Sequence, residues 1–435
     1  MTALGDTGRK LVLASIPFAV LLSASCISSE FTAGAPTSDG GSESSLADSR
    51  SGADGMTTDS GGTPRDAAPS DAALDGCAAC PSGTHCVGGS CVCDATSCST
   101  GCCSSGHCLA GNDTAACGNG GKACTSCNGL ACLSGVCNAP CTPTELASGQ
   151  GSPRGIAVDA ANAYWTNNTD GRVMRCALAG CGNAPTALAT SQNQPTGITV
   201  GETAVYWANG GGDIMACATG GCTTPKSITT SGMGFSRITV SLGDLFFSSF
   251  AAGAVYQCAD TGCAAASPTP LVMSPSADVV AADLTYFYWA DDTASGTINR
   301  CTRTNCRGTV TALASNQSNP NGIAVDLTTV YWVTTTSTGT GTVAKCAIGG
   351  CGGAPTLLAK GLQHPADIAV DAKNVYWTDD EAGALYACPL TGCPGLAAPP
   401  AFATGQMSPS AIAVDTTSVY WTNLVTAGSV MKCAK

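Results

Sequence analysis

One sequence pattern recurs seven times between residues 155 and 433, and it constrains the fold more than any other feature of the chain. Each copy holds a short apolar segment, an aromatic pair, a glycine turn and a cysteine, which in six copies has a second cysteine five positions later. The aromatic pairs begin at intervals of 42, 40, 42, 43, 45 and 44 residues. A fixed period of this length, built from short strands and tight turns, predicts a β-propeller with one blade per copy.

The aromatic pairs are Tyr164-Trp165, Tyr206-Trp207, Phe246-Phe247, Tyr288-Trp289, Tyr331-Trp332, Tyr376-Trp377 and Tyr420-Trp421. Because a pair occurs in mid-strand in every copy, we interpret the pairs as packing between blades rather than as a sugar-stacking surface. An aspartate closes the preceding strand in five copies, at Asp159, Asp283, Asp326, Asp371 and Asp415. We interpret these aspartates as turn caps rather than metal ligands. The prediction is an all-β, seven-bladed propeller; six blades is the alternative, because the Phe246-Phe247 copy is degenerate.

The run Tyr376-Trp377-Thr378-Asp379 matches the motif of the YWTD-repeat propellers of the low-density lipoprotein receptor family, and four other copies are near matches. The chain resembles that family over about two thirds of its length and, more broadly, resembles NHL and TolB-like extracytoplasmic propellers. The resemblance implies a propeller, although the receptor propellers have six blades. The ligand-binding residues of that family therefore have no safe counterpart here.

Twenty-nine cysteines indicate an oxidising compartment. Two basic residues precede an apolar run over residues 11–22 that is too short to span a bilayer, as in a signal peptide. The stretch LSASC, which ends at Cys26, resembles the lipobox of bacterial lipoproteins. The resemblance implies a signal peptide over residues 1–25 and lipidation of Cys26. In the resembled class a residue other than Asp after the cysteine, here Ile27, favours anchoring in the bacterial outer membrane. The protein would then be periplasmic or surface-exposed. The alternative is an ordinary secreted protein in which Cys26 is incidental.

Composition divides the remainder into three parts. Residues 26–76 are rich in Ser, Gly, Ala, Thr and Asp and predict a disordered tether. Residues 77–140 contain fourteen cysteines, which predicts a disulfide-rich stalk. This stalk loosely resembles EGF-like modules, and its connectivity cannot be deduced from spacing. Residues 141–435 form the expected propeller.

The propeller cysteines predict seven disulfides. Six pairs share one spacing, which suits a hairpin loop with its flanking residues opposite each other. Gly, or Asn305 in one copy, precedes the second cysteine and would accept a positive φ. The last copy lacks a second cysteine, and Cys141 supplies the missing partner, so residues 141–147 are expected to complete the last blade. The predicted pairs are Cys176–Cys181, Cys217–Cys222, Cys258–Cys263, Cys301–Cys306, Cys346–Cys351, Cys388–Cys393 and Cys141–Cys433. Zinc is disfavoured, because His364 is the one histidine of this region.

The loops after the aromatic strands vary in sequence while the scaffold repeats, and variable loops on a rigid scaffold are where binding residues concentrate. They are expected to share one rim, and the alternative is a merely solvated surface. The candidate binding residues are Asn167, Asp170, Asn209, Asp213, Asp291, Asp292, Asp379, Asp380 and Glu381.

The charge balance and the motifs limit the function. A net charge of −12 with 18 basic residues disfavours nucleic acid. No catalytic triad, metal set or phosphate-binding glycine loop occurs, so no enzyme activity and no cofactor is predicted, and calcium has no support in the sequence. The prediction is a membrane-anchored extracytoplasmic scaffold that binds a protein or glycan partner through its rim. The alternatives are a lactonase- or lyase-like propeller enzyme and a structural envelope protein.

Overall fold

The computed structural model describes residues 84–87, 90–99, 102–105, 107–109, 116–118, 121–127, 131–133, 136–138, 140–230, 232–263, 268–336, 340–393 and 397–435. The expected signal peptide, lipidated Cys26 and tether lie outside the described residues. In the ranges above, no helix is long and apolar enough to cross a membrane.

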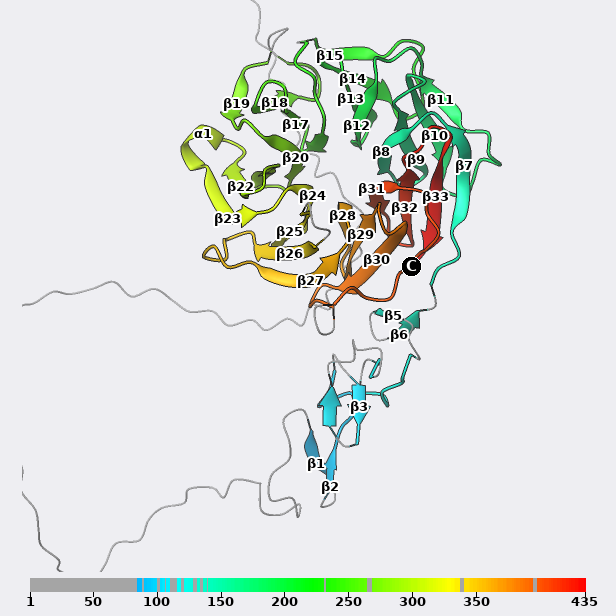
Figure 1. Ribbon diagram of the computed structural model, residues 1–435, viewed down its shortest axis with the longest axis vertical. Coiled ribbons are helices and arrows are strands. Elements are labelled where there is room, and N and C mark those ends of the chain that lie inside the picture. The colour runs from blue at the N-terminus through cyan, green and yellow to red at the C-terminus, as the bar shows by residue number, and fades with distance from the viewer. Residues whose placement is uncertain are drawn as a thin grey trace, which may run out of the picture. The chain divides into compact units, whose positions relative to one another are not determined.

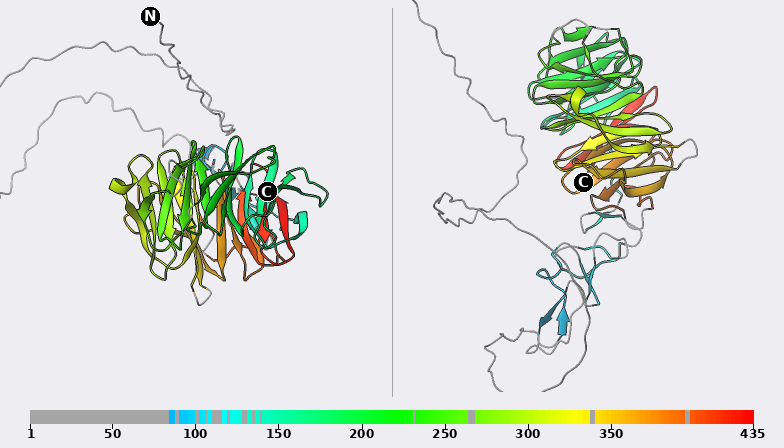
Figure 2. Two further views of the ribbon diagram at one scale, coloured as in Figure 1. Left: turned by 90° about the horizontal axis from the view of Figure 1, so that it is seen from above. Right: turned by 90° about the vertical axis from the view of Figure 1, so that its left-hand side faces the viewer.

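Seven antiparallel sheets surround a central axis, as Figure 1 shows, and the side view in Figure 2 shows them as a disc. This confirms the seven-bladed propeller. The innermost strands are β8 (Pro153–Val158), β12 (Pro195–Val200), β16 (Ile238–Ser241), β20 (Ala277–Ala282), β24 (Pro320–Val325), β28 (Pro365–Val370) and β31 (Pro409–Val414). They define blades 1 to 7. Five of these strands begin with proline, which is tolerated at the first residue of an edge strand because no ladder hydrogen bond is lost there.

The next two strands of each blade are regular in all seven sheets. The second strands, which carry the aromatic pairs, are β9 (Asn162–Asn167), β13 (Ala204–Asn209), β17 (Asp244–Ser249), β21 (Tyr286–Asp291), β25 (Thr329–Thr334), β29 (Asn374–Asp379) and β32 (Ser418–Asn423). The third strands are β10 (Arg172–Ala177), β14 (Asp213–Ala218), β18 (Ala254–Ala259), β22 (Gly296–Thr302), β26 (Gly341–Ala347), β30 (Ala384–Pro389) and β33 (Gly428–Ala434).

The outer strands are less uniform. Blades 1 to 5 end in β11 (Thr186–Ala189), β15 (Lys226–Thr230), β19 (Pro270–Met273), β23 (Thr311–Gln317) and β27 (Thr356–Leu362), and a short helix α1 (Cys306–Thr309) precedes β23. In the described part of blade 6, an isolated bridge between Leu385 and Ala403 stands in place of an outer strand.

Blade 7 takes its outer strand from the start of the propeller. Strand β7 (Thr144–Gln150) pairs antiparallel with β33, with Thr144 opposite Lys432 and Gln150 opposite Gly428. The strand therefore lies three residues further along the chain than the predicted segment 141–147. Cys141 stands just before it, where its N–H donates to the carbonyl of Phe402. One blade is thus assembled from both ends of the propeller sequence, as the cysteine pattern predicts.

The aromatic pairs pack between blades. Trp165 lies in one core cluster with Tyr420 of blade 7, and Trp207 lies in one with Tyr164 of blade 1. The same relation holds for Trp332 with Tyr288, Trp377 with Tyr331 and Trp421 with Tyr376. All six tryptophans are fully buried. A role in packing is confirmed, and these rings offer no surface to a ligand.

The strand-closing aspartates cap the turns between first and second strands. Asp159 accepts hydrogen bonds from the N–H groups of Ala161 and Asn162 through Oδ1 and from the Tyr164 hydroxyl, at 2.7 Å, through Oδ2. Asp283, Asp326, Asp371 and Asp415 repeat the arrangement. Burial, with the neighbouring carboxylate, raises the pKa of Tyr164 to about 12. The turn-capping interpretation is confirmed.

The propeller disulfides join the same seven pairs that the spacing predicts. The hairpin geometry differs from the prediction. In blade 1, Arg175, not Cys176, pairs with the first residue of β11. The six pairs separated by five positions each close a tight turn at the end of the third strand. The glycine before the second cysteine has a positive φ, 109° at Gly180, as expected. Asn305 does not: its φ is −147°, because α1 begins at the next residue.

The described cysteine-rich residues form hairpins β1 (His85–Val87) with β2 (Ser90–Val92), β3 (Cys102–Ser104) with β4 (His107–Leu109), and β5 (Ala131–Leu133) with β6 (Val136–Asn138). Disulfides join Cys93–Cys103, Cys98–Cys108, Cys102–Cys124, Cys117–Cys132 and Cys127–Cys137. With so little buried apolar surface, these covalent links hold the hairpins together.

Candidate functional site

The two faces of the propeller differ. The loops between second and third strands lie beside the starts of the inner strands, since Asn168 N–H donates to Ser152 O and Asp380 N–H to His364 O. We call this side the loop face. The aspartate turns and the propeller disulfides lie at the other ends of the strands. The predicted binding residues all belong to the loop face.

Three of those predicted residues are buried and serve the scaffold. Asn167 and Asn209 each donate a side-chain hydrogen bond to a glutamine, Gln150 and Gln192. Asp379, 1% exposed, accepts from the N–H groups of Gln363, His364 and Ala382. Side chains enclosed in this way cannot contact a partner, so we correct the prediction and remove these three from the candidate site.

The other predicted residues are spread around the rim. Asp291 accepts from Thr297 at 2.6 Å and Asn299 at 2.9 Å, and it also contacts Ser274. Asn319 donates to Asp292, and burial raises the pKa of that carboxyl. Asp170 is exposed and accepts from Asn167 and from the N–H of Arg172. Asp213 is half-buried and Glu381 exposed. The acidic rim is thus mostly committed to holding its own loops.

Asp380 forms a rim contact that is suited to acid–base chemistry. Its Oδ1 lies 2.6 Å from Nδ1 of His364, and both side chains are partly exposed. The contact orients the ring and leaves Nε2 of the histidine turned to other partners. Sequence spacing did not reveal this pair, because sixteen positions separate the two residues.

The second region of interest lies around the propeller axis, where the inner strands begin on the loop face. We call this axial region the central channel and its loop-face end the mouth. In six blades the pairing register shifts at the second or third residue of the inner strand, as between Pro153 and Ile156. Such β-bulges redirect side chains and are common beside binding sites. The bulged residues differ from blade to blade, although the strands around them repeat.

Five polar residues lie at these bulges and a sixth, Arg237, lies directly before the regularly paired strand β16. We call the six the channel ring: Arg154, Arg237, Asp278, Asn321, Asp367 and Ser410. They come from blades 1, 3, 4, 5, 6 and 7. In blade 2 the equivalent Thr196 hydroxyl instead donates to the carbonyls of Ala208 and Phe235. Arg237 and Asp367 stand where three other blades have glycine. At one of these, Gly155, an added Cβ would lie 2.6 Å from the carbonyl oxygen of Thr196 in the next blade.

The charges of the channel ring influence each other across the channel. Arg154 is exposed to solvent, but partial burial lowers the pKa of its guanidinium, and repulsion from Arg237 adds to the effect. Burial raises the pKa of Asp367, opposed by Arg237 and by hydrogen bonds from the N–H groups of Ile368 and Ile412. Groups that lie far apart in sequence therefore share one electrostatic environment.

Sequence reasoning missed the channel ring. The available signal was substitution within the repeat Pro-x-Gly-Ile-Ala-Val, in which Arg154 and Asn321 fill the x position and Asp367 replaces the glycine. Attention to the invariant residues identified the scaffold and passed over the positions that break the repeat. Whether those side chains converge depends on ring closure, which only the tertiary structure shows.

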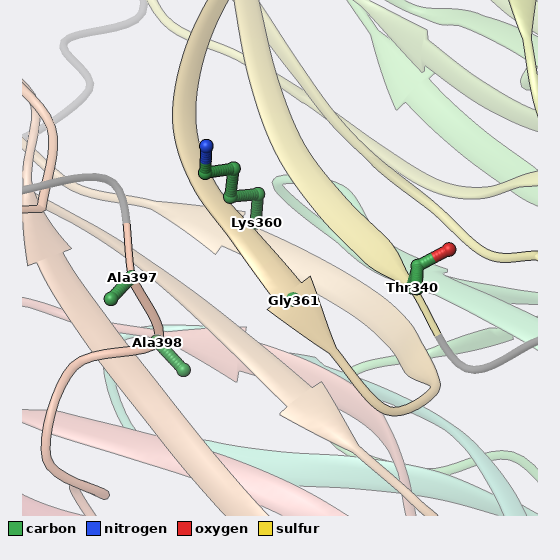
Figure 3. A pocket seen from close by; sticks show the side chains of 5 residues that line it. All are labelled: Thr340, Lys360, Gly361, Ala397 and Ala398. Atoms are coloured by element: carbon green, nitrogen blue, oxygen red, sulfur yellow. The ribbon is translucent and has the colours of Figure 1, made fainter.

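Clusters of metal-ligating atoms and a cavity occur among the described residues. In two clusters the cysteine sulfurs lie close enough together to hold an ion. The clusters are Cys93 with Cys98 and Cys108, and Cys117 with Cys127 and Cys137. Every one of these sulfurs is in a disulfide, which removes the thiolate that metals require. A cavity of about 530 Å³ lies at the outer edge of blade 5, lined by Thr340, Lys360, Gly361, Ala397 and Ala398 (Figure 3). With Lys360 as its sole charged group, it offers little to fix a ligand.

No protein-family model matches this chain, and neither does any curated protein sequence. Solved structures do match. Virginiamycin B lyase from Staphylococcus aureus aligns with a TM-score of 0.54 and 14% identity, over 68% of this chain and 98% of its own. Hydrazine synthase from Kuenenia stuttgartiensis aligns with a TM-score of 0.53 and 13% identity, over 67% and 98%. At these identities the likeness shows a shared fold and nothing more.

A nidogen–laminin complex also matches, with a TM-score of 0.42 and 19% identity over 51% of this chain and 87% of its own. That likeness is too weak to relate the two folds in detail.

Proposed function

We propose that this protein is an extracytoplasmic binding protein whose ligand enters the mouth of the central channel on the loop face. One observation carries the proposal. The channel ring breaks the sevenfold repeat with charged and polar side chains, and the surrounding residues keep it. The repeated residues are explained by their role in the scaffold. The channel ring needs another explanation, because partly buried charged groups destabilise a protein unless a partner compensates them.

The cysteines support the proposed compartment. Twelve disulfides lie among the described residues, and such density persists only where the environment is oxidising. We further propose export to the bacterial cell envelope, lipidation at Cys26 and a tether that leaves the propeller free to meet a protein or glycan partner. Metabolic labelling with a palmitate analogue tests the anchor, since Cys26→Ser should abolish incorporation.

The binding proposal is tested by blocking the channel. Ser410→Tyr in blade 7 would fill the mouth, and Thr416→Tyr places the same bulk in the aspartate turn of that blade on the opposite face. The full chain, made unlipidated by Cys26→Ser, is immobilised and offered separately to protein and glycan fractions of the native envelope. A specific ligand should be retained by the parent and by Thr416→Tyr and lost by Ser410→Tyr. Equal retention by all three proteins would refute a channel site.

A second candidate function rests on the His364–Asp380 pair. Nδ1 of His364 lies 2.6 Å from the Asp380 carboxylate, and an imidazole oriented in this way can take up a proton through Nε2. This favours a lyase- or lactonase-like reaction at the same face. His364→Gln should abolish turnover of a captured ligand if the protein is an enzyme. If the protein only binds, the parent and His364→Gln should both leave that ligand chemically unchanged.

A further inference from the structure

The two arginines of the channel ring have carboxylates nearby but no direct side-chain partner. Neither Arg154 nor Arg237 forms an ion pair or a side-chain hydrogen bond with any described residue. Elsewhere in the propeller guanidinium groups are engaged: Arg175 donates to Thr219 O at 2.6 Å, and Arg303 pairs with Asp244 at 2.9 Å. The channel arginines thus keep their donor groups free, and a planar fork of donors matches the geometry of a carboxylate.

Three of the other four channel-ring residues present groups suited to hydroxyls; the fourth, Asp367, already accepts from the N–H groups of Ile368 and Ile412. The side chains of Asp278 and Ser410 make no hydrogen bond within the described residues, and Asn321 makes only a long contact of 3.5 Å to Thr335. Asp278 lies close enough to Arg154 for their charges to interact. Carboxylate, amide and hydroxyl groups together accept from and donate to sugar hydroxyls, which need both kinds of partner.

An exposed aromatic ring lies on the same face. Phe250 is 56% exposed, and it is the one exposed aromatic side chain among the described residues. Its loop packs against the segment that leads to Arg237, since Ser249 Oγ donates to Met233 O and Ala251 lies beside Gly234. A large apolar ring kept in solvent costs free energy, and stacking on a flat apolar surface would remove that cost.

We propose that the channel mouth binds an acidic sugar, with its carboxylate on Arg154 and Arg237, its hydroxyls on Asp278, Asn321 and Ser410, and a sugar face against Phe250. The inference rests on the proposed function and names its ligand class. The inference concerns the channel mouth alone, because the protein as a whole is acidic. The two arginines offer a carboxylate ligand a positive charge that the rest of the surface does not.

The test uses trigalacturonate as the acidic sugar, with galactotriose as its neutral counterpart and acetate as a carboxylate without a sugar. Binding to the full chain carrying Cys26→Ser is measured by calorimetry at fixed ionic strength. Trigalacturonate should bind at least tenfold more tightly than either control probe. Arg154→Gln and Arg237→Gln should each weaken it about tenfold, as expected for a lost charge-assisted hydrogen bond, and Phe250→Ala should weaken it less.

Arg172→Gln is the matched control, because it removes the same charge from an exposed position on the loop face outside the channel. An equal loss of binding in this variant, or no binding of trigalacturonate at millimolar concentration, would overturn the acidic-sugar inference. A different result would refute the proposed function itself: capture of envelope ligands that survives Ser410→Tyr. Capture that depends on Ser410 but not on either arginine would keep the function and refute the ligand class.

Discussion

Cys141 and Cys433 form a disulfide between Cα atoms 6.1 Å apart, although 292 positions separate them in sequence. The bond joins the residue just before β7 to the third strand of blade 7. It therefore fastens the blade that closes the ring, which hydrogen bonds between β7 and β33 also hold. The six other propeller disulfides each span five positions within one blade.

The two kinds of disulfide should contribute unequally to stability. Chain entropy assigns about 6 kcal/mol to a loop as long as that closed by Cys141–Cys433 and about 2 kcal/mol to a five-residue loop. The double variant Cys141→Ser/Cys433→Ser should therefore lower the free energy of unfolding more than Cys346→Ser/Cys351→Ser, in guanidinium titrations without reductant. Equal losses would show that the closing bond adds nothing beyond strand pairing. Mass spectrometry of the parent should find no free thiol in the propeller.

The Asp371–Lys435 pair predicts a loss of stability in acid. Burial opposes ionisation of Asp371, but hydrogen bonds from the Lys435 ammonium, at 2.6 Å, and from the N–H groups of Asn374 and Lys373 outweigh it and lower the pKa of the carboxyl. A carboxyl with a lowered folded pKa stabilises the protein above its unfolded pKa of about 4, and this contribution is lost as the pH falls through the folded value.

The variant Lys435→Met should therefore be about 1–3 kcal/mol less stable than the parent near pH 6, with the gap narrowing below about pH 4. Unfolding titrations at several pH values measure the gap. Lys360→Met, at an exposed position, is the control and should show no such trend. A gap independent of pH would mean that Lys435 acts through its cation–π contact with Tyr376 rather than through the Asp371 carboxylate.

Two buried tryptophans differ in their hydrogen bonding. Nε1 of Trp332 donates to Gln317 at 2.9 Å, whereas Nε1 of Trp377 has no partner within the described residues. Both indoles are fully buried, so replacement by phenylalanine removes similar apolar volume. Trp332→Phe should cost about 1 kcal/mol more than Trp377→Phe, because it also breaks a hydrogen bond and leaves the glutamine unpaired. The midpoints of thermal unfolding would contradict this if their order were reversed.

Asp379 should prove structural, although the sequence placed it among the binding residues. Its carboxylate accepts three backbone hydrogen bonds while buried, so Asp379→Asn should lower the free energy of unfolding by about 1–3 kcal/mol. Glu381→Gln, two residues away and exposed, should change stability little. Ligand capture measured well below the unfolding temperature should survive both changes. Loss of capture in Asp379→Asn at full folding would return this residue to the site.

The repeat predicted most of the scaffold because its signals are local. Strand order, aspartate turns and six of the seven propeller disulfides follow from residues a few positions apart, and Gly180 adopts the positive φ that its turn requires. Asn305 failed the same rule, since the chain could satisfy the turn by starting α1 instead. The candidate site was harder, because Asn167 and Asp379 have the composition of loop ligands but the burial of core residues.

The sequence by itself determined the number of blades, the packing role of the Tyr-Trp pairs and the partner of Cys433, since each depends on a repeat read against its own copies. Only the tertiary structure decided which polar residues meet. Arg154 and Asp367 lie in blades 1 and 6, and neither spacing nor composition relates them. Closing seven sheets into a ring brings the starts of their inner strands around one channel, where burial and mutual charge make them a candidate site.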